Sequence, residues 1–151
     1  MKRVAGAILF FFGLALNASA QQAVVADPTT WSYEAKKMNA DEYELTFKLK
    51  LEEGWHIWSL TPGGDGYEII PSFKIEKGTT KGALEENGHK TTAKMEGFDN
   101  AVTYLSGNVE YKQVVKAKGD KITGEHEYQI CNDKMCLPPK TKKFEVVLNR
   151  D

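Results

Sequence analysis

Two cysteines carry the most reactive chemistry in this sequence. Cys131 and Cys136 are the only cysteines among its 151 residues, and four residues separate them. Thiols this close in the chain can form a disulfide across a chain reversal. Such a disulfide serves either as a structural cross-link or as a dithiol/disulfide pair that exchanges electrons with other thiols.

The spacing of the two cysteines leaves both roles open. A disulfide that closes a loop of about six residues stabilises a fold by roughly 2 kcal/mol, which is less than a long loop would give. Short loops at turns are also places where strain and exposure make a disulfide easier to exchange. The spacing is not Cys-x-x-Cys and no helix is expected after Cys136, so the arrangement differs from that of thioredoxin.

A third interpretation of the cysteines is a soft metal site, such as one for copper. The ligands on offer are the two thiols, Met135 and the three histidines, His56, His89 and His126. No two of the histidines have the spacing of metal ligands, and a lone histidine on a strand is more often a packed or surface residue. We therefore expect neither a metal nor another cofactor.

Alternating apolar and polar residues predict the strands that position the cysteines. The alternation is regular over 42–51, 122–130 and 144–148, is broken at Gln113 and Val114 in the run 109–117, and is less regular over 31–38, 55–60 and 69–75. Turn residues separate these runs, and turns are predicted at Asn87-Gly88 and at Ser106-Gly107-Asn108, among others. Roughly seven or eight short strands without a helical segment predict an all-β fold, an immunoglobulin-like antiparallel β-sandwich.

The first 20 residues predict a cleaved signal peptide. A short basic start, an apolar run and Ala18-Ser19-Ala20 form the pattern that signal peptidase recognises. The apolar run is shorter than the roughly 20 residues of a membrane-spanning helix. We therefore expect a signal peptide over residues 1–20, one exported domain over residues 21–151, and no membrane span in the mature chain.

The charge balance argues against a nucleic-acid surface. The sequence has 20 basic and 21 acidic residues, and cleavage after residue 20 would remove two of the basic ones. The formal net charge would then move from −1 to −3. A nucleic-acid surface needs a basic stripe that replaces counterions, so nucleic acid is not an expected partner.

The residues around the cysteines resemble a known family. The stretch Cys131-Asn132-Asp133-Lys134-Met135-Cys136-Leu137-Pro138-Pro139 resembles the active-site hairpin of the N-terminal periplasmic domain of the thiol:disulfide interchange protein DsbD. Residues 54–59 look like the glycine- and aromatic-rich strand of that family, and residues 97–113 look like its cap-loop and following strand. The resemblance covers most of residues 21–151 and implies an immunoglobulin-like sandwich in the periplasm.

The resemblance implies electron transfer by thiol–disulfide exchange. A thioredoxin-like domain of a membrane electron carrier would reduce the cysteine pair, which would then reduce periplasmic thiol-disulfide proteins or cytochrome c maturation factors. By the same analogy, Cys136 forms the mixed disulfide with the partner and Cys131 resolves it. The competing hypothesis is a binding module, in which a sandwich with an inert disulfide displays aromatic loops to a protein or a glycan.

The resemblance also implies four residues that surround the disulfide. His56 and Trp58 fall where the family has aromatic groups beside the bond. Glu96 and Phe98 fall at the cap-loop, whose aromatic ring shields the bond. Such shielding restricts access, which is one of the factors that set the rate of exchange. Core packing is the alternative role for Trp58 and Phe98.

Overall fold

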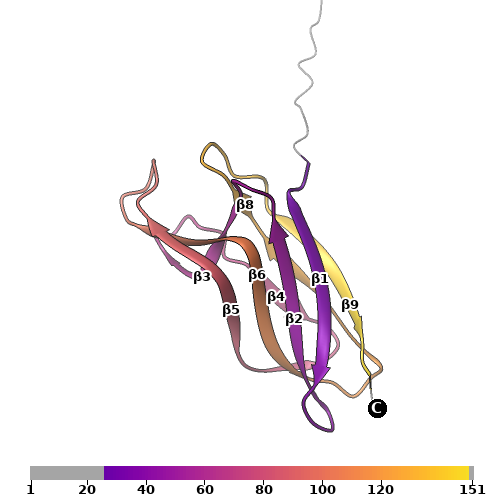
Figure 1. Ribbon diagram of the computed structural model, residues 1–151. Helices are drawn as coiled ribbons and strands as arrows, with labels where there is room; N and C mark the ends of the chain where they lie inside the picture. The colour runs from indigo at the N-terminus through magenta and orange to yellow at the C-terminus, as the bar shows by residue number, and fades with distance from the viewer. Residues whose placement is uncertain (1–25, 150–151) are drawn as a thin grey trace, which may run out of the picture.

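The computed structural model describes residues 26–149, which form strands and loops (Figure 1). The strands are β1 (Thr29–Lys37), β2 (Glu42–Leu51), β3 (His56–Gly63), β4 (Ser72–Ile75), β5 (Thr79–Ala93), β6 (Val102–Lys116), β7 (Lys121–Tyr128), β8 (Ile130–Cys131) and β9 (Lys140–Val147). The predicted signal peptide, residues 1–20, lies outside the described residues. Within residues 26–149 there is no helix of the length and apolarity needed to cross a membrane.

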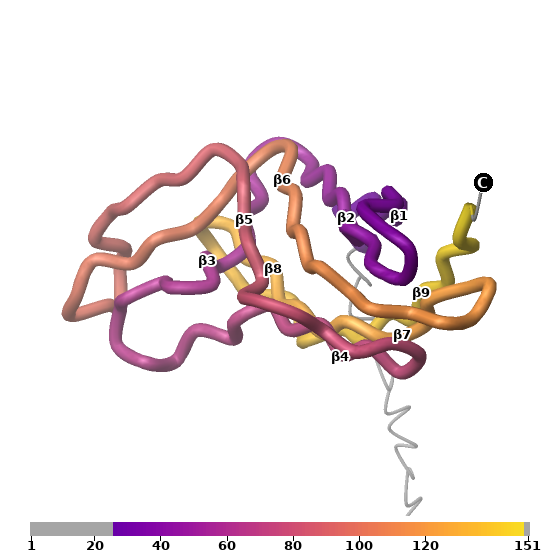
Figure 2. Tube along the Cα trace, turned by 90° about the horizontal axis from the view of Figure 1, so that it is seen from below, coloured from indigo at the N-terminus to yellow at the C-terminus, as the bar shows by residue number. Residues whose placement is uncertain are grey.

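The strands form two antiparallel sheets. The larger sheet has the order β1-β2-β6-β3-β8, with β5 paired to β6, and the smaller sheet has the order β4-β7-β9. β6 organises the larger sheet, because β5 pairs along one of its edges while β2 and β3 pair in turn along the other. In Figure 2, the ends of β3, β5 and β6 extend beyond the smaller sheet. The predicted all-β, antiparallel, immunoglobulin-like sandwich is confirmed.

Alternation along the strands builds the main core between the two sheets. β2 buries five side chains at every second position: Tyr43, Leu45, Phe47, Leu49 and Leu51. They pack with buried residues of β6, β7 and β9: Val109, Tyr111, Val115, Ile122, Phe144 and Val146. Each large apolar side chain contributes roughly 1.5–3 kcal/mol when it is fully buried, so this cluster is the main source of stability.

The prediction of turns at 87–88 and 106–108 is wrong, because both segments lie inside the paired strands β5 and β6. The register of this pair shifts between Gly88 and His89, where β6 carries two additional residues, Gly107 and Asn108. Gly107 has a φ of +69°, a conformation that favours glycine. A β-bulge and a turn both interrupt the extended backbone, so they use the same residue types and cannot be separated by composition alone.

A histidine is buried in the core among aromatic rings. His126 on β7 is 1% exposed, and its Nε2 lies 2.8 Å from the hydroxyl oxygen of Tyr33. The centroid of its ring lies 4.2 Å from that of Trp31 and 5.5 Å from that of Phe73. Desolvation, with a smaller contribution from the positive charge of Lys142, lowers the pKa of His126 to about 4.

We expect the free energy of unfolding to fall as the pH drops from 6.5 to about 4, because the unfolded chain protonates His126 before the folded chain does. The gap between the two pKa values corresponds to at most about 3 kcal/mol. His126→Phe keeps an aromatic ring and removes the titration, so it should flatten this part of the profile. Urea unfolding over a series of pH values measures the effect. If the free energy of unfolding of His126→Phe fell with pH as steeply as that of wild type, the prediction would be contradicted.

Candidate functional site

A tight hairpin holds the two cysteines together. Cys131 is the last residue of β8, and it forms both an antiparallel bridge and a disulfide with Cys136. The backbone N–H of Asn132 donates to the carbonyl oxygen of Met135 at 2.9 Å. The side-chain oxygen of Asn132 accepts hydrogen bonds from the backbone N–H groups of Lys134 and Met135, also at 2.9 Å. These bonds fix the turn, and a hairpin across the cysteines is therefore confirmed.

The two bonded cysteines differ in exposure. Cys131 is 2% exposed and packs with Trp58 and Val102 in a small apolar cluster that is separate from the main core. Cys136 is exposed on the outer arm of the hairpin, immediately before the buried Leu137. Cys136 is therefore the more accessible of the two residues to solvent.

Strand β3 supplies the aromatic surroundings of Cys131. His56 lies opposite Cys131 in the register of β3 and β8. Both His56 and Trp58 are buried, with ring centroids 5.1 Å apart, and the ring of Tyr104 on β6 lies 4.5 Å from His56. Desolvation lowers the pKa of His56, and the negative charge of Asp133 opposes this shift. The imidazole beside the disulfide is therefore neutral at pH 7.

The loop between β5 and β6 approaches the hairpin. It carries Glu96 and Phe98, and the Phe98 ring lies 5.9 Å from the ring of Trp58. The backbone N–H of Phe98 donates to the carbonyl oxygen of Met95 at 3.2 Å. Gly97 lies inside this turn with a φ of +87°, which an L side chain adopts only with strain. The turn brings Phe98 back toward Trp58.

A hollow of about 200 Å³ lies between this loop and the hairpin. Its lining comes from both sides, with Trp58, Met95, Glu96 and Phe98 on one and residues 131–136 on the other. The structure therefore brings five of the six predicted site residues around one cavity. His56, the sixth, is not part of the lining and contacts Trp58 instead.

Two further side chains at the site go beyond the sequence prediction. Met95 packs against the small cluster of Trp58, Val102 and Cys131, and Tyr104 packs against the same cluster. Tyr104 lies two residues after Val102 on β6, so strand alternation places both on one face and is the signal that could have identified it. Met95 lies in a loop, where no such period exists.

The residues of the possible copper site are not brought together. His126 lies in the main core with its hydrogen bond to Tyr33, and His89 is exposed on β5. His56 is the one histidine opposite a cysteine in the strand register. Among residues 26–149, no three His, Cys, Asp or Glu side chains form a group that could hold a metal ion.

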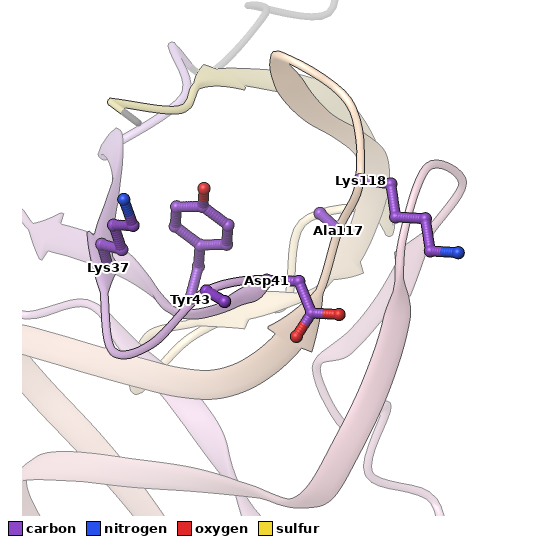
Figure 3. A pocket seen from close by; sticks show the side chains of 6 residues that line it. Lys37, Asp41, Tyr43, Ala117 and Lys118 are labelled. Carbon is purple, nitrogen blue, oxygen red and sulfur yellow. The ribbon is translucent and has the colours of Figure 1, made fainter. Parts of the chain in front are cut away.

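A larger hollow is lined by residues at the β1–β2 and β6–β7 connections. In Figure 1, the β1–β2 connection lies at the opposite end of the sandwich from the loop that follows β8. The hollow has a volume of about 360 Å³, and its described lining consists of Lys37, Ala40, Asp41, Tyr43, Ala117 and Lys118 (Figure 3). Asp41 forms an ion pair with Lys116 at 3.0 Å, beside this hollow. The described lining contains no cysteine or histidine.

Comparison with known proteins gives a family match over most of the chain. The family model described as thiol:disulfide interchange protein DsbD, N-terminal, matches residues 21–148. No curated protein matches the sequence. Among solved structures, the N-terminal periplasmic domain of ScsB from Proteus mirabilis is similar, with a TM-score of 0.59 and 12% identity over 78% of this chain and 44% of that chain. This likeness shows a shared fold, and the present chain spans less than half the length of that solved chain.

A second similar structure is the N-terminal domain of DsbD from Neisseria meningitidis in its reduced form. It has 19% identity and a TM-score of 0.43, over 74% of this chain and 80% of that chain.

Proposed function

Because the chain belongs to the family of the N-terminal domain of the thiol:disulfide interchange protein DsbD, we propose that it exchanges electrons with other proteins through Cys131 and Cys136. The observation that carries the proposal is the unequal exposure of the two cysteines. Thiol–disulfide exchange needs one sulfur that a thiolate can reach and a second sulfur that leaves. The hairpin offers Cys136 for the first role and Cys131 for the second.

Reduction of the domain begins with a thiolate of the electron donor. This thiolate attacks Sγ of Cys136 and forms an intermolecular disulfide, while the internal bond breaks and leaves its electron pair on Sγ of Cys131, which takes up a proton from solvent. A second cysteine of the donor then attacks the intermolecular disulfide and releases Cys136 as a thiolate. We assign the donor role to a thioredoxin-like domain of a membrane electron carrier.

Reduction of the acceptor follows the same steps in reverse. The thiolate of Cys136 attacks the acceptor's disulfide, and one acceptor sulfur leaves as a thiolate. The thiolate of Cys131 then attacks Sγ of Cys136, which restores the internal disulfide and releases the acceptor in its dithiol form. The proposed acceptors are periplasmic thiol-disulfide proteins or cytochrome c maturation factors.

Four residues are proposed to protect the disulfide from unproductive thiols. The ring of Phe98 packs on Trp58 beside the hairpin. The ring of His56, two residues before Trp58 on β3, also packs on Trp58. Glu96 is exposed on the loop of Phe98, where its charge meets an approaching partner. Restricted access slows exchange with small thiols and leaves exchange to partners whose surfaces fit the site.

We further propose that residues 21–151 work as one domain in the periplasm after removal of residues 1–20. The start of the family match at residue 21 supports this boundary. The compartment is consistent with the bonded cysteine pair, because disulfides persist in the oxidising periplasm and are rare in the cytosol.

The reduction potential of the Cys131–Cys136 pair tests this function. A domain that passes electrons should equilibrate with glutathione and show a potential above about −300 mV, whereas a structural disulfide lies below that value. Tryptophan fluorescence can follow the equilibrium, because Trp58 packs against Cys131. The variant Cys131→Ser/Cys136→Ser keeps the tryptophans without the redox pair and should show no change. A potential well below that limit would favour the binding module with an inert cross-link.

A further inference from the structure

The loop that carries Phe98 is fastened to a second loop, which follows β3. Asp65 lies in this second loop, and its carboxylate accepts three hydrogen bonds from the loop of Phe98. The donors are the backbone N–H of Asp99 at 2.7 Å, the backbone N–H of Asn100 at 2.9 Å and the side-chain amide of Asn100 at 2.8 Å. One carboxylate thus joins two loops that are more than thirty positions apart in the sequence.

The loop of Asp65 is itself held in a defined shape. The carboxylate of Glu68 accepts hydrogen bonds from the backbone N–H groups of Asp65 at 3.1 Å and Gly66 at 2.9 Å. Gly64 and Gly66 have φ values of +69° and +85°, which favour glycine. The backbone N–H of Gly64 also donates to the carbonyl oxygen of Ala101 at 3.0 Å. These hydrogen bonds fix the backbone around Asp65, from which its carboxylate binds the other loop.

Each of the two joined loops is connected along the chain to an aromatic residue beside the disulfide, Trp58 in one case and Phe98 in the other. The loop of Asp65 follows β3, which carries Trp58. The residues bound by Asp65, which are Asp99 and Asn100, directly follow Phe98. Asp65 is therefore hydrogen-bonded to the two residues that follow Phe98, whose ring contacts Trp58.

We propose that Asp65 is a positioning residue that holds Phe98 against Trp58 beside the Cys131–Cys136 disulfide and thereby limits the access of small thiols. The inference rests on the proposed function, because protection matters for a disulfide that exchanges. A charged carboxylate is a stronger acceptor than a neutral group. The hydrogen bond from the backbone N–H of Asp99 lowers the pKa of Asp65, so the carboxylate stays charged at neutral pH.

Replacing Asp65 by alanine in the full chain tests the inference. The rate constant for reduction of the disulfide by dithiothreitol should rise about fivefold or more. Each lost hydrogen bond raises the equilibrium constant for opening of the loop by about that factor. The backbone amides of Asp99 and Asn100 should also exchange faster with deuterium. Asp99→Ala is the matched control, since it removes a neighbouring carboxylate and keeps the N–H that binds Asp65. Both measurements should stay within about twofold of wild type in this control.

An Asp65→Ala rate within about twofold of wild type, in a variant that unfolds cooperatively, would overturn the inference. An equal rise in Asp99→Ala would do the same. If Asp65→Ala does not fold, Asn100→Ala replaces it, and loss of its side-chain bond should raise the rate about fivefold. An unchanged rate in Asn100→Ala would then overturn the inference. Excess dithiothreitol reduces structural and exchangeable disulfides alike, so failure here is distinct from failure of the proposed function, which the reduction potential tests.

Discussion

Replacement of Cys136 by serine is expected to abolish formation of the mixed disulfide, whereas replacement of Cys131 by serine is expected to trap it. The Cys131→Ser variant keeps the exposed thiol and loses the thiol that would resolve the intermediate. The Cys136→Ser variant keeps a cysteine that is 2% exposed in the disulfide-bonded protein. Reaching a buried sulfur requires local opening, and an opening that costs about 3 kcal/mol lowers the accessible population roughly a hundredfold.

Reaction with glutathione disulfide measures this difference. Each variant has a single thiol, so the two are matched controls for each other. We expect the rate of glutathionylation, followed by intact mass, to be roughly a hundredfold higher for Cys131→Ser than for Cys136→Ser. Equal rates in two folded variants would contradict the assignment of Cys136 as the sulfur that meets the partner.

Replacement of Gly124 by alanine is expected to destabilise the sandwich by about 3 kcal/mol. Gly124 is buried on β7, between Ile75 of β4 and Phe144 of β9. A Cβ atom at this position would overlap the carbonyl oxygen of Lys74 and lie 2.7 Å from Cζ of Phe144. The backbone oxygen cannot move without disturbing the pairing of β4 with β7. This steric cost exceeds the roughly 1 kcal/mol that alanine gains over glycine in chain entropy.

Gly119→Ala is the matched control for this substitution. Gly119 lies in the exposed connection between β6 and β7, and the nearest atom to an added Cβ is the carbonyl oxygen of Lys121 at 3.7 Å. We expect its free energy of unfolding to stay within about 0.5 kcal/mol of wild type. Urea denaturation measures both variants, and equal stability of the two would show that β7 tolerates the added methyl group.

The strands of the main core could be predicted from the sequence, whereas β5 could not. Residues 42–51 alternate because one face of β2 meets the core and the other meets solvent. Most side chains of β5 are exposed on both faces, so its residues carry no apolar period. The strand is defined by its backbone pairing with β6, which side-chain types do not report. The Asn87-Gly88 pair of this polar edge strand is therefore taken for a turn.

The candidate site divides in the same way. The cysteine pair is visible in the sequence because its bond depends on a local chain reversal. The burial of Cys131 is not visible in the sequence. The residues that pack against it, Trp58 and Val102, come from the distant strands β3 and β6. The role inferred for Asp65 depends on a contact between two loops, and loops carry no period that would place their side chains.

The separate packing of Cys131 has a consequence for how the fold responds to a change in oxidation state. Cys131, Trp58 and Val102 form a minor cluster apart from the main core. Proteins open in cooperative units that differ in free energy, and a minor unit opens without the rest. In the proposed redox cycle, cleavage of the disulfide removes a cross-link from this minor cluster, and we expect the packing between the two sheets to stay unchanged. If the pair cycles as proposed, we expect the domain to pass between its oxidised and reduced forms with a local loss of order and without global unfolding.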